Sequence, residues 1–363
     1  MKTGTVTWIS FRNFGTYLQA YALQKALQNL GCENKVIDDA KVVAAFPKKK
    51  ISPIRMLRSI PWLYPKRAEF NRKSAQAVSL YEDFKNTYID LDKAWSNREE
   101  LAAAYDTFIA GSDQIWSPTS YFDDFYYLGF TDRKKVAYAP SLGTTVYPEH
   151  RAEMAKPYIE KFASLSVREP QGAALLKEQF GLDALVVADP TVLLTRSDWE
   201  KLTAEPTADE KPYVLCYFLT YNKAYIDYAK EYCRRKGLAM KLLVVRHDFV
   251  GLTNDEVYTG PIGFLNAVKG ARTILTDSFH ATIFSMLFEK QFYTFKRFMD
   301  GSAVSQNSRI ENMLGKVGLT ERLLDESSVM VEDSSIPYEK VGAIIAQMRT
   351  ESIDYLKNAL NIA

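Results

Sequence analysis

The chain has 363 residues, and its 46 lysines and arginines against 44 aspartates and glutamates leave a formal net charge of +2 at pH 7. Apolar residues make up 47% and charged residues 25%, a balance typical of folded soluble proteins that excludes a disordered chain, a fibre and a general nucleic-acid binder. The length predicts two domains, and the longest apolar run, residues 213–219, is too short to cross a membrane, which takes about 20 residues.

The cysteines and the start of the chain favour a cytoplasmic protein. Cys32, Cys216 and Cys233 are odd in number and lack the spacing of a metal site, so we expect reduced, buried thiols. The first residues run directly into an expected strand and lack the long apolar core of a secretory signal.

The N-terminal half alternates expected strands and helices. A buried strand at 5–9, a polar loop at 10–16, a helix at 17–30 and a strand beginning at 35 form one strand–helix–strand unit. Further apolar runs that end in polar turns predict strands at 107–110, 136–139, 164–167 and 185–188. This alternation predicts a mostly parallel sheet with helices on both faces.

A polar stretch at 203–212 predicts a linker, and the same pattern begins again after it. The expected strands lie at 213–219, 241–246, 273–276 and 291–295, and the expected helices at 223–236, 261–271 and 278–289. We therefore expect an α/β fold in which two doubly wound, Rossmann-like domains face a cleft. In such domains ligands bind outside the carboxyl ends of the strands.

These patterns give three expected regions: an N-terminal domain at 1–202, a C-terminal domain at 203–336, and a C-terminal helix within 337–363. Packing of that helix back on the N-terminal domain is one arrangement that fits. The N-terminal domain also contains a basic insertion, residues 47–73, with nine lysines and arginines, one acid and interleaved apolar residues that include Trp62. It reads either as a solvated, partly helical insertion or as a contact with an anionic membrane surface.

The strongest chemical signal is the sequence TDSFHAT at 276–282, where an expected strand meets an expected helix. Ser278 can cap that helix, and His280 falls in its first turn. Because a helix start attracts anions, an imidazole there can donate a proton to an anionic substrate. The alternative is a structural histidine bonded to a nearby carbonyl group.

Two loops and several cations are further candidates. The loop residues follow one expected strand or open the first helix, where they could bind a ligand or only form turns and caps: Gly111, Ser112, Asp113, Gln114, Asn13, Gly15 and Thr16. Arg168 follows the strand at 164–167 and could grip a carboxylate or phosphate, or pair with Glu169. A basic rim is expected from Lys296, Arg297 and Arg309.

Several common catalytic motifs are absent from the sequence. It contains no Walker loop, GxGxxG, HExxH or GxSxG pattern, and no Cys/His/Asp set with metal-ligand spacing. This argues against phosphoryl transfer from ATP, dinucleotide chemistry and zinc hydrolysis. An anion-binding cleft with one well-placed histidine is what the residues support.

Taken together, the motifs resemble those of the polysaccharide pyruvyl transferase family. They run in order along the chain as FRNFGTYLQAYALQKAL, FIAGSDQIWSP, SVREPQG, ADPTVLL, TDSFHATIFSMLFEKQFYTF and NSRIENML. The resemblance implies a fold similar to GT-B glycosyltransferases. It also implies transfer of pyruvate from phosphoenolpyruvate to two hydroxyls of a sugar, giving a cyclic ketal with no metal or other cofactor. The implied acceptor is a cell-surface polysaccharide, capsule or exopolysaccharide, or its lipid-linked precursor at the inner face of the membrane.

The resemblance also assigns residues. His280 matches the family's catalytic histidine and Arg168 a basic residue of the donor site, whereas Ser278 stands where characterised members tend to have an arginine. The remaining donor candidates that could supply this charge are Lys296, Arg297 and Arg309. Two alternatives stay open: a GT-B-type glycosyltransferase that uses a nucleotide sugar, and a catalytically silent member that binds glycan.

Overall fold

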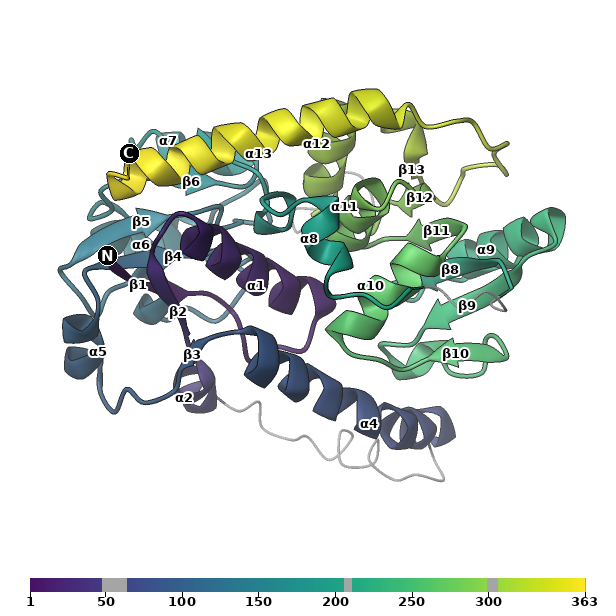
Figure 1. Cartoon of the computed structure of the whole chain (residues 1–363), viewed down its shortest axis with the longest axis horizontal. Helices are drawn as coiled ribbons and strands as arrows, with labels where there is room; N and C mark the ends of the chain where they lie inside the picture. Colours follow the sequence, from purple (N-terminus) through teal and green to yellow (C-terminus); the bar gives the residue numbers. More distant parts are fainter. Residues whose placement is uncertain (48–63, 206–210, 299–305, 363) are drawn as a thin grey trace.

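The computed structural model describes residues 1–47, 64–205, 211–298 and 306–362, which form two α/β domains side by side (Figure 1). The N-terminal domain is built on a parallel sheet in the order β3-β2-β1-β4-β5. Its strands are β1 (Lys2–Val6), β2 (Glu33–Ile37), β3 (Leu91–Asp92), β4 (Thr107–Ala110) and β5 (Lys134–Ala137). A small parallel pair, β6 (Ser166–Val167) and β7 (Leu185–Val186), adjoins it.

The C-terminal domain contains a second parallel sheet, in the order β10-β9-β8-β11-β12-β13. Its strands are β8 (Tyr213–Tyr217), β9 (Ala239–Leu243), β10 (Asp255–Val257), β11 (Thr273–Thr276), β12 (Gln291–Phe295) and β13 (Leu323–Leu324). In both sheets the first strand in sequence lies between the second and the fourth, which is the doubly wound Rossmann order with its switch point beside that strand. The expected fold class is confirmed.

Helices cover both sheets. In chain order they are α1 (Phe14–Asn29), α2 (Ala40–Ala45), α4 (Pro65–Tyr88), α5 (Arg98–Ala104), α6 (Glu149–Ile159), α7 (Pro170–Phe180), α8 (Arg196–Glu200), α9 (Lys223–Lys236), α10 (Pro261–Gly270), α11 (Phe279–Leu287), α12 (Asn307–Val317) and α13 (Tyr338–Leu360). Short 3₁₀ turns add η1 (Asp124–Tyr127), η2 (Pro190–Val192), η3 (His247–Phe249) and η4 (Thr320–Arg322).

Several expected elements have different bounds in the structure, among them the first strand and the first helix. The first strand is Lys2–Val6, so the expected strand at 5–9 lies three residues too late. The first helix begins at Phe14, inside the expected loop at 10–16, because the side chain of Asn13 accepts the backbone N–H groups of Gly15 and Thr16 and caps it.

Two long helices hold the domains together (Figure 1). In α4, the Lys73 ammonium lies 2.9 Å from Glu256 in the C-terminal domain. In the second half of α13, Ser352 Oγ accepts the Ala188 N–H at 2.9 Å and the Tyr355 hydroxyl donates to the Ala137 carbonyl at 2.7 Å, so this half lies on the N-terminal domain. The cleft between the domains is thus bridged on both sides.

An aromatic core fills the contact between the domains. Phe14 at the start of α1 stacks on Phe264 of α10, with ring centroids 4.8 Å apart, and on Tyr81 of α4 at 5.5 Å. All three rings are buried in one cluster that continues through both domains. Such stacked pairs add to the free energy of apolar burial, and they fix the position of the α1 N-terminus against the second domain.

The basic insertion lies mainly outside the described residues, which exclude 48–63. Its end, from Pro65, forms the first turns of α4. There Lys73 pairs with Glu69 at 2.8 Å as well as with Glu256, so this cation contacts the C-terminal domain. Across the described ranges, no helix is long and apolar enough to span a membrane. The three cysteines are buried free thiols, as expected.

Candidate functional site

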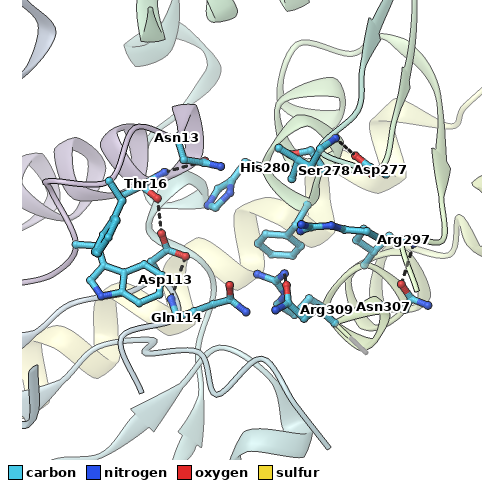
Figure 2. A pocket seen from close by; sticks show the side chains of 16 residues that line it. Asn13, Thr16, Asp113, Gln114, Asp277, Ser278, His280, Arg297, Asn307 and Arg309 are labelled. Carbon is cyan, nitrogen blue, oxygen red and sulfur yellow. Dashed lines mark hydrogen bonds between the residues drawn. The ribbon is translucent and has the colours of Figure 1, made fainter. Parts of the chain in front are cut away.

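A cavity of about 250 Å³ lies between the domains at the carboxyl ends of their central strands (Figure 2). The N-terminal domain contributes the loops after β1 and β4, and the C-terminal domain those after β8, β11 and β12 together with the start of α12. The lining residues are Trp8, Phe11, Asn13, Thr16, Asp113, Gln114, Leu219, Asp277, Ser278, Phe279, His280, Arg297, Gln306, Asn307, Arg309 and Ile310. Both switch points therefore open onto one cavity, where doubly wound domains bind ligands.

His280 stands at the start of α11, as the sequence predicts. Ser278 is the N-cap, and its Oγ accepts the Ala281 N–H at 3.4 Å. The imidazole is 8% exposed, and its Nε2 has no hydrogen-bond partner within the described ranges. The ring packs against Gly15 in the first turn of α1, where an added Cβ would lie 2.0 Å from Nδ1. Two helix N-termini, one from each domain, thus meet at this histidine.

Asp189 faces His280 from the N-terminal domain. Its Oδ2 lies 3.5 Å from His280 Nε2 and accepts Arg168 Nη1 at 2.6 Å, while Oδ1 accepts both the amide and the hydroxyl of Thr191. Burial alone would raise the Asp189 pKa, but the positive charges and donors of His280 and Arg168 outweigh it and hold that pKa well below its usual value. A fixed negative charge therefore lies beside the imidazole.

Arg168 lies beside the cavity rather than in its lining. Its guanidinium pairs with Asp189 and, through Nε at 3.2 Å, with Glu169, and its side chain is only 2% exposed. The ion pair with Glu169 that the sequence left as an alternative is therefore present. The residue contacts the ring of Phe279 and lines a neighbouring cavity of about 310 Å³.

Arg309, from α12, is a buried cation in the wall of the cavity. Its Nη2 donates to Gln306 at 2.6 Å, its Nε has no partner, and no carboxylate in the described part of the chain forms an ion pair with it. Burial lowers its pKa to about 10, and the nearby charge of Arg168 adds to this effect. The carboxylates of Glu169 and Asp113 oppose this shift from a distance, but neither pairs with the guanidinium. A buried arginine without a paired carboxylate provides a place for an anion.

The other C-terminal candidates are placed differently. Arg297 lines the cavity and donates from Nε to the Thr220 hydroxyl at 3.0 Å. Lys296 is not among the lining residues, and its ammonium lies 4.0 Å from Glu311. Lys296 points elsewhere because successive residues after a strand alternate in direction. Of the three cations in the predicted basic rim, Arg297 and Arg309 line the cavity and Lys296 does not.

On the N-terminal side, Asn13, Thr16, Asp113 and Gln114 line the cavity as expected. Gly111 and Ser112 do not. Ser112 is fully buried, and its Oγ donates to the Ala139 carbonyl at 2.9 Å, which makes it part of the sheet edge. A Cβ at Gly111 would lie 3.0 Å from a Thr5 methyl, so this glycine allows close packing between β1 and β4.

Sequence reasoning missed two acidic residues that shape the site. The sequence pattern marks Asp189 only as part of the polar turn after the expected strand at 185–188. The other candidates also follow expected strands. Asp277 accepts the N–H groups of Leu219 and Thr220 at 2.6 and 3.0 Å, and so joins the ends of β8 and β11. Burial raises its pKa to about 6, although these hydrogen bonds and Arg297 oppose the shift.

The comparison with family models decides the relationship. The model described as polysaccharide pyruvyl transferase matches residues 13–297, more than three quarters of the chain. The chain belongs to this family. The match includes His280 and the cavity residues from Asn13 to Arg297, while Trp8 and Phe11 lie before it and Arg309 lies beyond it. No curated protein matches the chain significantly.

Solved structures similar to this member of the polysaccharide pyruvyl transferase family share little sequence with it. The glycotransferase of kitacinnamycin is 16% identical, covers 99% of both chains and has a TM-score of 0.44. S. aureus MnaA, in a co-structure with UDP, is 13% identical and has a TM-score of 0.49, covering 100% of this chain and 97% of its own. E. coli heptosyltransferase WaaC is 12% identical, with a TM-score of 0.41 and coverages of 96% and 99%.

No group of three or more His, Cys, Asp or Glu side chains in the described ranges could hold a metal ion. What the cavity does combine is an imidazole beside a fixed carboxylate, a buried arginine that forms no ion pair in the described ranges, and the N-terminus of α11. This arrangement can bind an anion and give it a proton.

Proposed function

We propose that the chain transfers pyruvate from phosphoenolpyruvate to a sugar of a cell-surface polysaccharide, or of its lipid-linked precursor, and forms a cyclic ketal. Membership of the polysaccharide pyruvyl transferase family supports this class of transferase. The observation that carries the proposal is that His280 and Arg309, a buried cation with no ion pair in the described residues, line one interdomain cavity. Phosphoenolpyruvate is an anion that must be protonated, so its site requires a proton donor next to a place for negative charge.

The donor presents two anionic groups, a carboxylate and a phosphate, to the cationic side of the cavity. Arg297 and Arg309 line that side, and the α11 N-terminus adds the partial positive charge of its free N–H groups. Ser278 leaves this helix start without the arginine that characterised members tend to carry. In our proposal Arg309, which reaches the cavity from α12, supplies that charge.

His280 acts as the general acid. Protonation of the methylene carbon of phosphoenolpyruvate creates an oxocarbenium-like centre at the carbon that bears the phosphate, and a sugar hydroxyl attacks this carbon. Loss of phosphate and attack by a second hydroxyl complete the ketal. The Asp189 carboxylate lies beside this ring, 3.5 Å from Nε2. General acid catalysis of this kind contributes about 10²–10⁴-fold to the rate.

The direct test is incubation with phosphoenolpyruvate and lipid-linked oligosaccharides, followed by mass spectrometry for a gain of one pyruvyl unit. Thermal-shift measurements with phosphoenolpyruvate and with a panel of nucleotide sugars separate the proposal from a glycosyltransferase. Stabilisation by nucleotide sugars alone would contradict it. Stabilisation by phosphoenolpyruvate without turnover on any acceptor would favour a silent, glycan-binding protein.

Arg309→Met tests the anion site. We expect the affinity for phosphoenolpyruvate to fall about 10–100-fold, since a hydrogen bond to a charged group contributes about 1.5–3 kcal/mol. The melting temperature should stay the same or rise, because an apolar side chain replaces a buried cation that forms no ion pair in the described residues. The measurement is a thermal shift with and without phosphoenolpyruvate.

The matched control is Arg349→Met in α13. Arg349 is half-buried and donates to the carbonyls of Val192 and Leu194, outside the cavity lining. This variant should lose stability but keep its response to phosphoenolpyruvate. If Arg309→Met loses stability and keeps donor affinity, Arg309 has only a structural role.

We also propose that the protein works at the cytoplasmic face of the membrane, held by the basic insertion at 47–73. The support is sequence composition alone, since each Lys or Arg near an anionic bilayer contributes about 1 kcal/mol. Changing Lys48, Lys49, Lys50, Arg55 and Arg58 to Glu should abolish co-sedimentation with anionic vesicles and spare activity on a short soluble acceptor. Failure of the wild type to bind such vesicles at low salt would contradict the proposal.

A further inference from the structure

The two faces of the cavity differ in charge. Arg297, Arg309 and the α11 N-terminus lie on the face formed by the C-terminal domain. The opposite face, formed by the N-terminal domain, presents the amides of Asn13 and Gln114 and one carboxylate, Asp113 (Figure 2). A carboxylate repels an anionic donor but accepts hydrogen bonds from hydroxyl groups. The N-terminal face is therefore suited to a neutral, hydroxyl-rich ligand.

Asp113 is held in a conformation that a non-glycine residue seldom adopts. Its φ is +69°, in the left-handed region, and its backbone carbonyl accepts the Ser141 N–H at 2.7 Å. The carboxylate accepts the Thr16 hydroxyl at 2.5 Å and the Gln114 N–H at 2.9 Å, and it forms no ion pair within the described ranges. Strained backbone of this kind is found at functional sites, and here it directs a carboxylate to the cavity.

Asp113 and His280 are connected through one turn of α1. Thr16, which donates to Asp113, follows Gly15, which packs against the His280 ring. The proton donor and this carboxylate therefore border the same cavity of about 250 Å³ from opposite domains. Asp277, the other acid in the lining, is less suited to exchange protons with a ligand, because both of its oxygens accept backbone N–H groups that join β8 and β11, whereas Asp113 accepts one backbone N–H and one hydroxyl. Asp277 is 1% exposed and Asp113 6%.

An aromatic pair borders the same face. The rings of Trp8 and Phe11 lie 5.2 Å apart at 65° to each other, in the loop after β1, and Phe11 is 38% exposed. Exposed aromatic rings next to polar side chains are characteristic of binding surfaces with one apolar and one polar element. A pyranose has this character, since its C–H face packs on a ring while its hydroxyls point to polar groups.

We propose that the N-terminal face, bordered by Trp8 and Phe11, binds the acceptor sugar, and that Asp113 is the general base which removes the proton from the attacking hydroxyl. This inference rests on the proposed function. It divides the cavity between the domains, so that the C-terminal domain binds the donor and the N-terminal domain the acceptor.

The protons balance. His280 gives one proton to the methylene carbon, which becomes a methyl group. The first sugar hydroxyl bonds to the neighbouring carbon and its proton passes to Asp113, and the departing phosphate takes up one proton. The second hydroxyl then bonds to the same carbon and loses its proton through Asp113 as well. The two hydroxyl protons thus equal the one gained by carbon and the one gained by phosphate, with solvent restoring His280.

Asp113→Asn removes the carboxylate charge and is expected to preserve the fold. Asparagine tolerates a positive φ, its Oδ1 can accept the Gln114 N–H, and its Nδ2 can donate to the Thr16 hydroxyl, so the loop should be preserved. We expect the thermal shift with phosphoenolpyruvate to be unchanged and kcat to fall about 100-fold or more. Phosphate release is measured with methyl β-galactopyranoside, methyl β-glucopyranoside and methyl α-mannopyranoside, which carry free hydroxyls at O4 and O6.

Phe11→Ala tests the aromatic border. It should raise the KM for the sugar about tenfold and leave the response to phosphoenolpyruvate unchanged, whereas Tyr121→Ala, which removes another exposed ring outside the cavity lining, should change neither. Near-normal kcat in Asp113→Asn, or loss of its donor binding, overturns the role of Asp113. A wild type that phosphoenolpyruvate does not stabilise instead contradicts the proposed function itself.

Discussion

His280→Gln is expected to lower kcat by about 10²–10⁴-fold while the protein keeps its fold and its affinity for phosphoenolpyruvate. Glutamine has a similar length and keeps an N–H group near Asp189, but it cannot transfer a proton at neutral pH. Because His280 lies at the first turn of α11, where its neighbours cap the helix, the substitution leaves the local backbone bonds in place. Steady-state phosphate release and a melting curve measure the two effects.

The matched control for this variant is His247→Gln. His247 is about half exposed, pairs with Asp248 and does not line the cavity, so its replacement should leave kcat unchanged. Near-normal turnover in His280→Gln would remove His280 from the mechanism. A fall in melting temperature together with the loss of activity would instead point to a structural histidine, the alternative that the sequence left open.

Secondary structure in the C-terminal domain was predictable because its apolar runs are short and clearly bounded. The expected bounds at 223–236, 273–276 and 291–295 are those of α9, β11 and β12. Outside these runs the prediction was less complete. The helix α4 was not predicted, because charged residues dominate its sequence and its buried apolar face is narrow, with Ala77, Tyr81 and Phe84 at helical spacing. The Lys73–Glu256 ion pair with the other domain also fixes it. Contacts between distant segments leave no periodic signal in the sequence.

The candidate site shows the same limit. Asp113, His280 and Arg297 were predicted to lie at one site because each follows an expected strand, and the carboxyl ends of parallel strands share an edge. All three line the cavity. The same reasoning could not tell that Lys296 points away or that Arg168 is already paired with Asp189. Those outcomes depend on which charges meet between different segments of the same domain, and position after a strand does not specify this.

The catalytic geometry therefore depends on both domains at once. His280 belongs to the C-terminal domain, but its two nearest functional neighbours, Asp189 and Gly15, belong to the N-terminal domain. A shift of one domain against the other would change the distance from the imidazole to its carboxylate. The bridging helices α4 and α13, together with the aromatic core around Phe14, oppose such a shift.

Gly15→Ala is expected to reduce kcat about 100-fold with little change in melting temperature. A Cβ at this position would lie 2.0 Å from Nδ1 and 2.3 Å from Cγ of His280, a separation that forces the buried ring to move. Misplacement of a reacting group by about 1 Å costs on the order of 10²-fold in rate. Alanine favours a helix over glycine by up to about 1 kcal/mol, so α1 itself should remain intact.

Gly342→Ala provides the comparison. Gly342 also lies within a helix, α13, but an added Cβ there meets no atom within 4 Å. This variant should raise the melting temperature slightly and leave kcat unchanged, because it gains helix propensity without touching the site. If both variants behave alike in phosphate-release assays, the close approach of α1 to His280 has no catalytic role. A difference confined to kcat places the histidine ring under the control of the opposite domain.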